Sequence, residues 1–165
     1  MSAPRQTHSK ILDREQLVNV RTKLRAEGKK LAFTNGCFDL LHSGHIRTLE
    51  FARSCGDALV VAINADAGVR GLKGPGRPIV PERERAEVLA ALACVDFVVL
   101  FAEPDPGDLI RAVVPDVLVK GGDWAEDAIV GRDTVEAAGG RVERVPPVEG
   151  RSTTNIIAKV IEADR

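Results

Sequence analysis

Short apolar runs alternate along the chain with segments whose apolar residues recur at helical spacing. Continuous apolar runs are typical of buried strands, and recurrence roughly every three to four residues is typical of amphipathic helices. The pattern predicts strands at 30–35, 57–64, 95–101, 116–120 and 141–146, and helices near 13–27, 45–55, 82–93, 105–114, 126–138 and 152–163. The three middle strands are nearly all apolar, as expected for strands that are covered on both faces.

The regular alternation of strands and helices predicts a parallel sheet with right-handed crossovers, in a Rossmann-like three-layer α/β/α fold with a mostly parallel sheet. Ligands bind such sheets beyond the carboxyl ends of the strands. The candidate loops therefore follow Asn35, Asn64, Phe101 and Lys120. Gly71–Pro81, rich in glycine and proline, is expected to be one long loop at this edge.

Composition narrows the class of protein. The chain has 165 residues, which suits one domain, and its net charge of −1 gives no reason to expect a nucleic-acid partner. No apolar run reaches the ~20 residues that a membrane helix needs, and the N-terminus lacks the apolar core of a signal peptide. Three cysteines without a CxxC pair indicate reduced thiols. We therefore expect a cytoplasmic protein with no membrane association.

The stretch TNGCFDLLHSGH, from Thr34 to His45, follows the first predicted strand. Gly36 permits a tight turn off the strand, and the next helix begins near Ser43 or Gly44. His42 and His45 would then lie at the first turn of this helix, whose free N–H groups and dipole favour an anion. The stretch therefore predicts a phosphate site with two imidazole donors.

Two other interpretations of the histidine pair stay open. One histidine could cap the helix while the other packs in the core. Alternatively, Asp39, His42 and His45 could hold a metal ion; Cys37 is a further candidate, and no other fourth ligand is obvious from the sequence.

Later segments add further candidates for phosphate binding. Ser152, Thr153 and Thr154 precede an apolar helix, where their hydroxyls could cap it or share its N–H groups with a phosphate. Lys73 lies in a segment that could close over a site, and Arg85 begins a helix whose positive end disfavours a cation unless an anion is bound.

The motifs that the sequence lacks exclude several classes of reaction. The chain contains no Walker A sequence and no GxSxG elbow, and GPGRPI does not fit the dinucleotide fingerprint. We therefore expect phosphate chemistry without a protein nucleophile. A phosphate monoester that attacks a nucleotide α-phosphate needs no base, because its second pKa is about 6 and it is already an anion near neutral pH.

Two motifs carry a resemblance to a known family. HSGH at His42–His45 and STTNII at Ser152–Ile157 resemble the HxGH turn and the later STT helix start of the cytidylyltransferase-like nucleotidyltransferases. The resemblance begins near Lys30, which implies an N-terminal extension and helix at 1–29 and a nucleotidyltransferase domain at 30–165. It also implies the HxGH nucleotidyltransferase variant of the Rossmann-like fold.

The segments TNGCFDLLHSGH, LKGPGRP, VDFVV, LVKGGDW and STTNII most resemble the branch that makes ADP-heptose, a precursor of the lipopolysaccharide inner core. The resemblance implies that AMP passes from ATP to D-glycero-β-D-manno-heptose 1-phosphate, with release of pyrophosphate and Mg²⁺ as cofactor. ATP and the sugar 1-phosphate would be the partners. A homodimer is compatible with it, although no residue pattern requires one. No kinase domain precedes the motifs, so we expect the stand-alone form.

The resemblance also assigns roles to residues. His42, His45 and Lys73 are expected to be catalytic and to contact the nucleotide phosphates, whereas Asp39 and Arg85 are the candidates for substrate binding, with Asp39 facing the sugar phosphate or the metal. No residue is assigned with certainty as a direct metal ligand. The expected nucleotide-binding residues are Asn35, Gly36, Phe38, Gly44, Gly121, Gly122, Asp123, Ser152, Thr153 and Thr154.

Two alternatives to the adenylyltransferase interpretation remain. Cytidylyltransferases for alcohol phosphates such as glycerol 3-phosphate carry an arginine shortly before the STT start, where this chain has Pro146 and Pro147. In this chain the cation would have to come from Arg151 or from elsewhere. A nucleotide-binding regulator without turnover would keep the pocket and lose some phosphate donors, yet this sequence contains all of them.

Overall fold

The structure is a computed structural model that describes residues 6–121, 128–146 and 150–164. Its strands form one six-stranded sheet in the order β1-β4-β3-β2-β5-β6, and all of the strand pairs are parallel. The strands are β1 (Ile11–Leu12), β2 (Leu31–Gly36), β3 (Ala58–Asn64), β4 (Phe97–Phe101), β5 (Val117–Gly121) and β6 (Arg141–Val145). The predicted Rossmann-like fold is thus confirmed, with a wholly parallel sheet.

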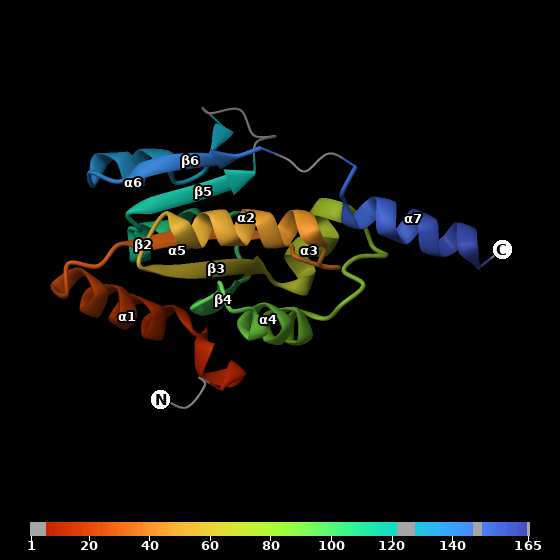
Figure 1. The fold of residues 1–165 in the computed structure, drawn as a ribbon, viewed down its shortest axis with the longest axis horizontal. Helices are drawn as coiled ribbons and strands as arrows, with labels where there is room; N and C mark the ends of the chain where they lie inside the picture. Colours follow the sequence, from red (N-terminus) through yellow and green to blue (C-terminus); the bar gives the residue numbers. More distant parts are fainter. Residues whose placement is uncertain (1–5, 122–127, 147–149, 165) are drawn as a thin grey trace.

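Helices cover both faces of this sheet (Figure 1). They are the 3-10 helix η1 (Thr7–Lys10) and the α-helices α1 (Arg14–Ala26), α2 (Ser43–Ser54), α3 (Asp66–Lys73), α4 (Glu82–Ala91), α5 (Gly107–Val113), α6 (Arg132–Ala137) and α7 (Thr153–Ala163). Leu49 of α2 and Leu89 of α4 pack in the core on one face, and Leu17 of α1 and Ile110 of α5 pack in the core on the other. The fold therefore has three layers.

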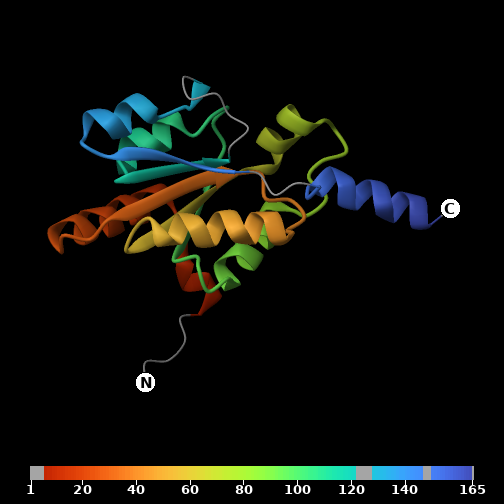
Figure 2. The same cartoon turned by 45° about the horizontal axis from the view of Figure 1, so that its top comes forward.

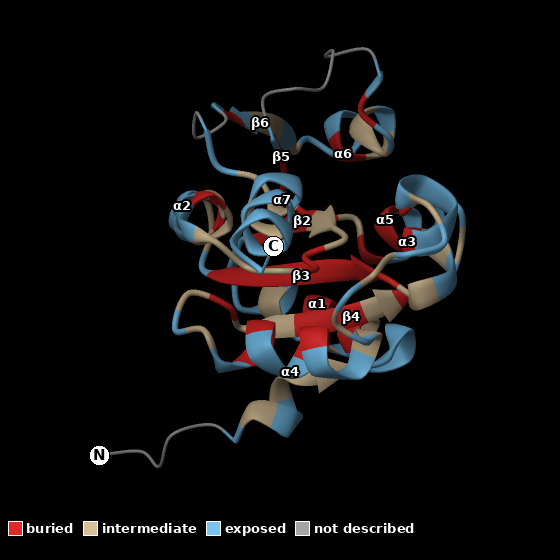
Figure 3. Cartoon of the chain, turned by 90° about the vertical axis from the view of Figure 1, so that its right-hand side faces the viewer, coloured by how far each residue is buried: buried red, intermediate tan, exposed pale blue. Residues whose placement is uncertain are grey.

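The burial of the middle strands follows directly from their apolar composition. Every residue of β3 is buried, as Figure 3 shows along its length. Such a strand has no solvent face, because helices from both outer layers pack on its alternating side chains. Nowhere in the described ranges does a helix combine the length and apolar composition that crossing a membrane requires.

The N-terminal segment contributes to the same sheet. β1 pairs with β4 at one sheet edge, and Leu17 of α1 is fully buried in the core. Arg21 of α1 ties the helix to the loop before β5 through an ion pair with Asp116 at 2.8 Å. The boundary predicted between residues 29 and 30 stays a prediction.

Two predicted elements differ from the structure. The sequence pattern indicated no helix between β3 and Gly71, yet α3 occupies residues 66–73 and includes the first three residues of the predicted loop. Val69 is the buried residue of α3, while two glycines weaken its helical pattern. The helix predicted at 126–138 is observed as α6 over residues 132–137, and part of the predicted range lies outside the described residues.

The helix α7 extends away from the body of the molecule (Figures 1 and 2). None of its residues is buried, and only its first turn lies at the sheet's edge, where Thr153 binds the loop before α2. In Figure 1 the strand arrows point toward this first turn. The carboxyl ends of the strands and the start of α7 thus meet at one place.

Candidate functional site

A cavity of about 660 Å³ lies at the carboxyl ends of the strands. It is the position at which a doubly wound parallel sheet binds its ligands. The residues around it are Asn35, Gly36, Cys37, Phe38, Asp39, His42, His45, Asn64, Leu72, Lys73, Arg77, Pro104, Asp105, Pro106, Lys120, Ile129, Val130, Arg151, Ser152, Thr153 and Thr154. Most of the side chains predicted for the site therefore share a single cavity.

The HSGH motif forms the first turn of α2. His42 is the N-cap residue, and its Nδ1 accepts a hydrogen bond from the Gly44 backbone N–H at 3.2 Å. A neutral imidazole whose Nδ1 accepts must carry its proton on Nε2, which leaves that N–H as a donor. The His42 ring stacks on the His45 ring with centroids 3.9 Å apart. The motif thus both caps the helix and holds two imidazoles together at the cavity.

Both imidazoles are neutral at pH 7. Burial, and then the nearby His42, lower the pKa of His45 from 6.5 to about 4. Burial also lowers the pKa of His42, with a further contribution from the Arg151 guanidinium. The buried Nδ1 of His45 has no hydrogen-bond partner in the described part of the chain, so nothing there compensates for a charge on the ring. These groups can therefore act as neutral hydrogen-bond donors before a ligand binds.

The low pKa of His45 predicts a pH-dependent stability. Between pH 6.5 and about 4 the unfolded chain binds a proton at His45 that the folded protein does not, so the free energy of unfolding falls as the pH is lowered through this window. The expected loss is about 3 kcal/mol between pH 7 and pH 4. Urea unfolding of the wild type and of His45→Gln, at the same series of pH values, measures it. Equal pH slopes for the two proteins would contradict this protonation state.

The start of α7 lies at the same cavity. Ser152 is the N-cap residue and accepts a hydrogen bond from the Asn155 N–H at 3.1 Å, while the Thr153 hydroxyl donates to the Leu40 carbonyl at 2.9 Å. This second bond ties the beginning of α7 to the loop that leads into α2. Two helix N-termini, each a favourable place for an anion, therefore border one cavity.

Asp39 lies in the cavity wall, but other groups occupy its carboxylate. The Ile79 and Val80 N–H groups each donate to it at 2.9 Å, and Arg77 Nε donates at 2.6 Å. Burial would raise the pKa of Asp39, but these hydrogen bonds outweigh burial and hold it below its ordinary value. The predicted contact with the sugar phosphate or metal would have to break these bonds. In this arrangement Asp39 instead anchors the loop between α3 and α4.

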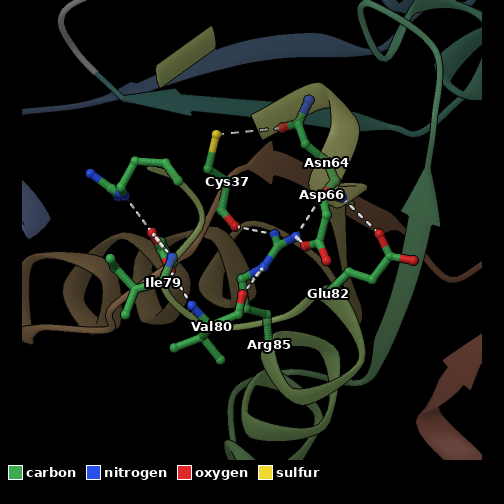
Figure 4. A network of polar contacts seen from close by, with 9 residues as sticks. Cys37, Asn64, Asp66, Ile79, Val80, Glu82 and Arg85 are labelled. Carbon is green, nitrogen blue, oxygen red and sulfur yellow. Dashed lines mark hydrogen bonds and ion pairs between the residues drawn. The ribbon is translucent and has the colours of Figure 1, made fainter. Parts of the chain in front are cut away.

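Arg85 lies apart from the other predicted site residues. The residue is 1% exposed and is not among those that line the cavity, so its predicted contact with substrate stays a prediction. Its guanidinium donates to the carbonyls of Val80, Cys37 and Asn64 and to the Asp66 carboxylate (Figure 4). Hydrogen bonds from three chain segments, together with the Asp66 carboxylate, offset the charge of Arg85 at the start of α4.

The glycines predicted to bind the nucleotide differ in where they lie. Gly36 lines the cavity, whereas Gly44 packs beneath His42: an added Cβ would lie 2.9 Å from the His42 Nδ1. Gly121 ends β5 outside the cavity wall. Gly122 and Asp123 lie outside the described residues. Gly44 thus serves the histidine turn by leaving room for the imidazole.

Phe38 has an unusual backbone conformation for a bulky residue. Its φ of 45° lies in the left-handed region, and its ring packs against His45 with centroids 5.3 Å apart. The turn after β2 thereby presents an aromatic wall behind the imidazole. Asn35 and Phe38 both line the cavity, and their predicted contact with the nucleotide stays a prediction.

Several polar residues of the cavity were missed by the sequence analysis as site residues. Lys120 is buried at the end of β5, and Asp105 follows β4. Lys120 follows Leu118 on the same face of β5, so a lysine that continues a buried strand face could have pointed to it. Arg77 and Arg151 join Lys73 as the other cations of the wall, which contains four cations and two carboxylates.

The described residues do not form a ready-made metal centre. No group of three or more His, Cys, Asp or Glu side chains in that part of the chain is placed to hold an ion. Asp39 is fully engaged, and one oxygen of Asp105 already accepts from the Gly107 N–H at 2.7 Å. The described residues therefore do not fit a resident Mg²⁺ site made by protein ligands alone, and the predicted Mg²⁺ stays a prediction.

Comparison with known proteins fits this geometry. A family model described as Cytidylyltransferase-like matches residues 33–159. The chain is 53% identical over 158 residues to "Bifunctional protein HldE" of Trichlorobacter lovleyi, covering 96% of this chain and 32% of that protein. It is 54% identical to the protein of the same name from Syntrophotalea carbinolica, covering 93% of this chain and 31% of that protein. It thus spans about a third of the length of these relatives.

Two solved structures are also similar to this chain. The lipopolysaccharide core biosynthesis protein from Thermoplasma volcanium superposes with a TM-score of 0.61 at 30% identity, covering 75% of this chain and 100% of that chain. The pantoate-beta-alanine ligase from Francisella tularensis, 19% identical, shares the fold with a TM-score of 0.60, over 93% of this chain and 77% of its own. The histidine turn, the second helix start and the matching family model lead to one conclusion: the chain belongs to the cytidylyltransferase-like family.

Proposed function

We propose that this protein transfers AMP from ATP to D-glycero-β-D-manno-heptose 1-phosphate and so makes ADP-heptose and pyrophosphate. The observation that carries the proposal is the single cavity between the starts of α2 and α7, with the stacked pair His42 and His45 in its wall. The similarity to proteins called HldE and to a lipopolysaccharide core biosynthesis protein supports the choice of sugar.

The reaction forms one phosphorus–oxygen bond and breaks another. An oxygen of the sugar 1-phosphate attacks the α-phosphorus of ATP, and the bond from that phosphorus to the pyrophosphate oxygen breaks. The attacking group is already an anion near pH 7, so no side chain has to remove a proton. The protein must instead align two anions and reduce the repulsion between them.

The cavity supplies donors for both tasks. The Nε2–H of His42 and the N–H groups at the starts of α2 and α7 are fixed before the nucleotide arrives, so little reorganisation is needed as charge builds at the α-phosphate. His45 stacks on His42 and shares this position. We assign His42 and His45 to the α-phosphate, and Ser152, Thr153 and Thr154 to the phosphates from the side of α7.

The cations around the cavity suit the leaving pyrophosphate. Lys73 ends α3, and Arg77 donates to Asp39 through Nε, which leaves the outer nitrogens of its guanidinium for a ligand. Arg151 precedes α7 and lies close enough to His42 to lower its pKa. We assign these three residues to the β- and γ-phosphates.

Pyrophosphate release tests this function. Purified protein is incubated with Mg²⁺ and either ATP or CTP, together with the heptose 1-phosphate or with glycerol 3-phosphate. We expect release only with ATP and the heptose 1-phosphate. Release with CTP and glycerol 3-phosphate would favour the alternative alcohol-phosphate cytidylyltransferase, and nucleotide binding without release from any pair would favour a regulator. The cytoplasmic location and the homodimer stay predictions.

A further inference from the structure

A buried lysine lies on the side of the cavity away from the histidines. Lys120 and Leu118 share a face of β5, and Asn35 and Phe33 share the same face of β2, because side chains alternate along a strand. Leu118 and Phe33 both pack in the core formed with α1 and α5, whereas α2 covers the other face. Lys120 thus reaches the cavity from the α5 side of the sheet.

The sheet register places Lys120 beside Asn35. Thr34 pairs with Val119, so one further step along both strands sets Asn35 next to Lys120. The Lys120 Nζ donates a hydrogen bond to the Asn35 Oδ1, and both residues line the cavity. Neighbouring strand ends therefore hold these two side chains in one plane of the sheet.

This hydrogen bond determines which end of the Asn35 amide faces the cavity. An ammonium group can only donate, so the atom facing Lys120 must be the amide oxygen. The amide nitrogen of Asn35 consequently points away from Lys120 with two N–H donors, and no residue in the described part of the chain accepts from it. If the amide were reversed, an oxygen would stand where the N–H groups now stand.

Keeping the buried Lys120 side chain charged costs free energy, because the ammonium loses contact with water. Lys120 is only 8% exposed, and burial lowers its pKa to about 8, with the Asp105 carboxylate acting in the opposite direction. Because a buried charge is often no better for stability than an apolar side chain of similar size, its presence in a cavity wall indicates a role other than stability. Methionine is the apolar side chain closest to lysine in length.

We propose that Lys120 is a positioning residue, which fixes the Asn35 amide so that its N–H groups donate to an acceptor atom of the bound nucleotide. The acceptor belongs to a chemical class that the geometry defines: a phosphate oxygen, a hydroxyl oxygen or a ring nitrogen with a free lone pair. This inference rests on the proposed function, since it assumes that a nucleotide occupies the cavity. Lys120 acts through Asn35 and not directly on the ligand.

A double-mutant cycle tests the inference by calorimetric titration with MgATP. Lys120→Met and Asn35→Ala should each weaken MgATP binding about tenfold, the scale of one hydrogen bond to a charged or well-oriented partner. The double variant should bind no more weakly than the weaker single variant, because the effect of Lys120 on the ligand passes through the amide that Asn35→Ala removes. Lys30→Met, which changes an exposed lysine before β2, is the matched control and should bind as the wild type does.

Thermal unfolding separates positioning from a structural role. Lys120→Met should unfold at about the same temperature as the wild type, because methionine keeps the packing of the lysine stem and the groups it leaves, Asn35 and Asp105, line the open cavity. A loss of binding that accompanies a lower unfolding temperature would overturn the inference, as would unchanged binding by Lys120→Met. A double variant in which the two losses multiply to about a hundredfold would also overturn it, since Lys120 would then act on the ligand independently of Asn35.

The pH dependence of MgATP binding distinguishes positioning from packing, because a lysine that only packs would not change this dependence. As the pH rises through about 8 the ammonium loses its proton, the neutral amine can accept from the amide, and MgATP affinity should fall. Asp105 is a charged group that acts on Lys120, and the Asn35 amide does not titrate. Lys120→Met should lack this fall, and an identical fall in both proteins would refute the role. If MgATP binds as described but no pyrophosphate is released, the proposed function fails while the positioning role stands.

Discussion

Replacing His45 with alanine is expected to lower the rate of pyrophosphate release at least about a hundredfold, while the protein stays folded. The loss of one oriented donor from a closed site has effects of this size. His45 is well placed for such a role, because it is half-buried at the cavity, neutral at pH 7 and stacked on His42. Steady-state kinetics with ATP and the sugar phosphate measure the rate, and circular dichroism confirms the fold.

His8→Ala is the matched control for this prediction. His8 belongs to η1, its side chain is 80% exposed, and it is not among the residues that line the cavity. Its removal should leave the rate unchanged. If His45→Ala were to turn over as fast as His8→Ala, the imidazole would not take part in the transfer, and His45 would be a packing residue behind Phe38.

Replacing Arg85 with alanine is expected to lower the free energy of unfolding by about 3–5 kcal/mol, the cost of breaking a buried, hydrogen-bonded charge network. The change would leave the Val80, Cys37 and Asn64 carbonyls and the Asp66 carboxylate without their donor. Because these groups belong to the loops on both sides of the cavity, activity should fall with stability. Urea denaturation followed by tryptophan fluorescence or circular dichroism measures the loss.

Arg83→Ala separates the network from the mere removal of an arginine. Arg83 lies two residues earlier on the same helix and is exposed. This variant should change the free energy of unfolding by no more than about 0.5 kcal/mol, as is usual for a surface substitution. A stable Arg85→Ala protein with a raised Michaelis constant for the sugar phosphate would instead restore the substrate contact that the sequence predicted.

Much of the architecture could be predicted because local patterns and tertiary packing agree. β3 reads as a continuous apolar run, and it is buried because helices cover both of its faces. The HSGH motif could be placed at a helix start because glycine and serine favour such a turn, and the structure places His42 as the N-cap of α2. The same holds for Ser152 at α7.

Other elements depend on contacts that no local pattern reveals. The two-residue strand β1 exists because β4 offers it an open edge, and α3 forms despite its glycines. Arg85 illustrates the same limit for a side chain. Its position at a helix start indicated an anionic ligand, whereas its partners in the fold are three carbonyls and the Asp66 carboxylate, up to 48 positions away in the sequence. Partners at such separation are set by the fold.

Lys120 shows how a site residue can remain hidden in a strand. Its neighbours made β5 recognisable, and the lysine itself looked like the polar end of that strand. Only the pairing of β2 with β5 brings it to Asn35, and only burial makes its charge costly. The strand could thus be predicted from composition, whereas the role of the lysine required the sheet order.

The central claim is that the starts of α2 and α7 hold one polyphosphate between them. A crystal structure with Mg²⁺ and a non-hydrolysable ATP analogue tests this directly. The account predicts phosphate oxygens within hydrogen-bond distance of the His42 Nε2 and of the backbone N–H groups at Thr153 and Thr154. A metal ion coordinated by His42 and His45, with the phosphates bound elsewhere, would contradict it.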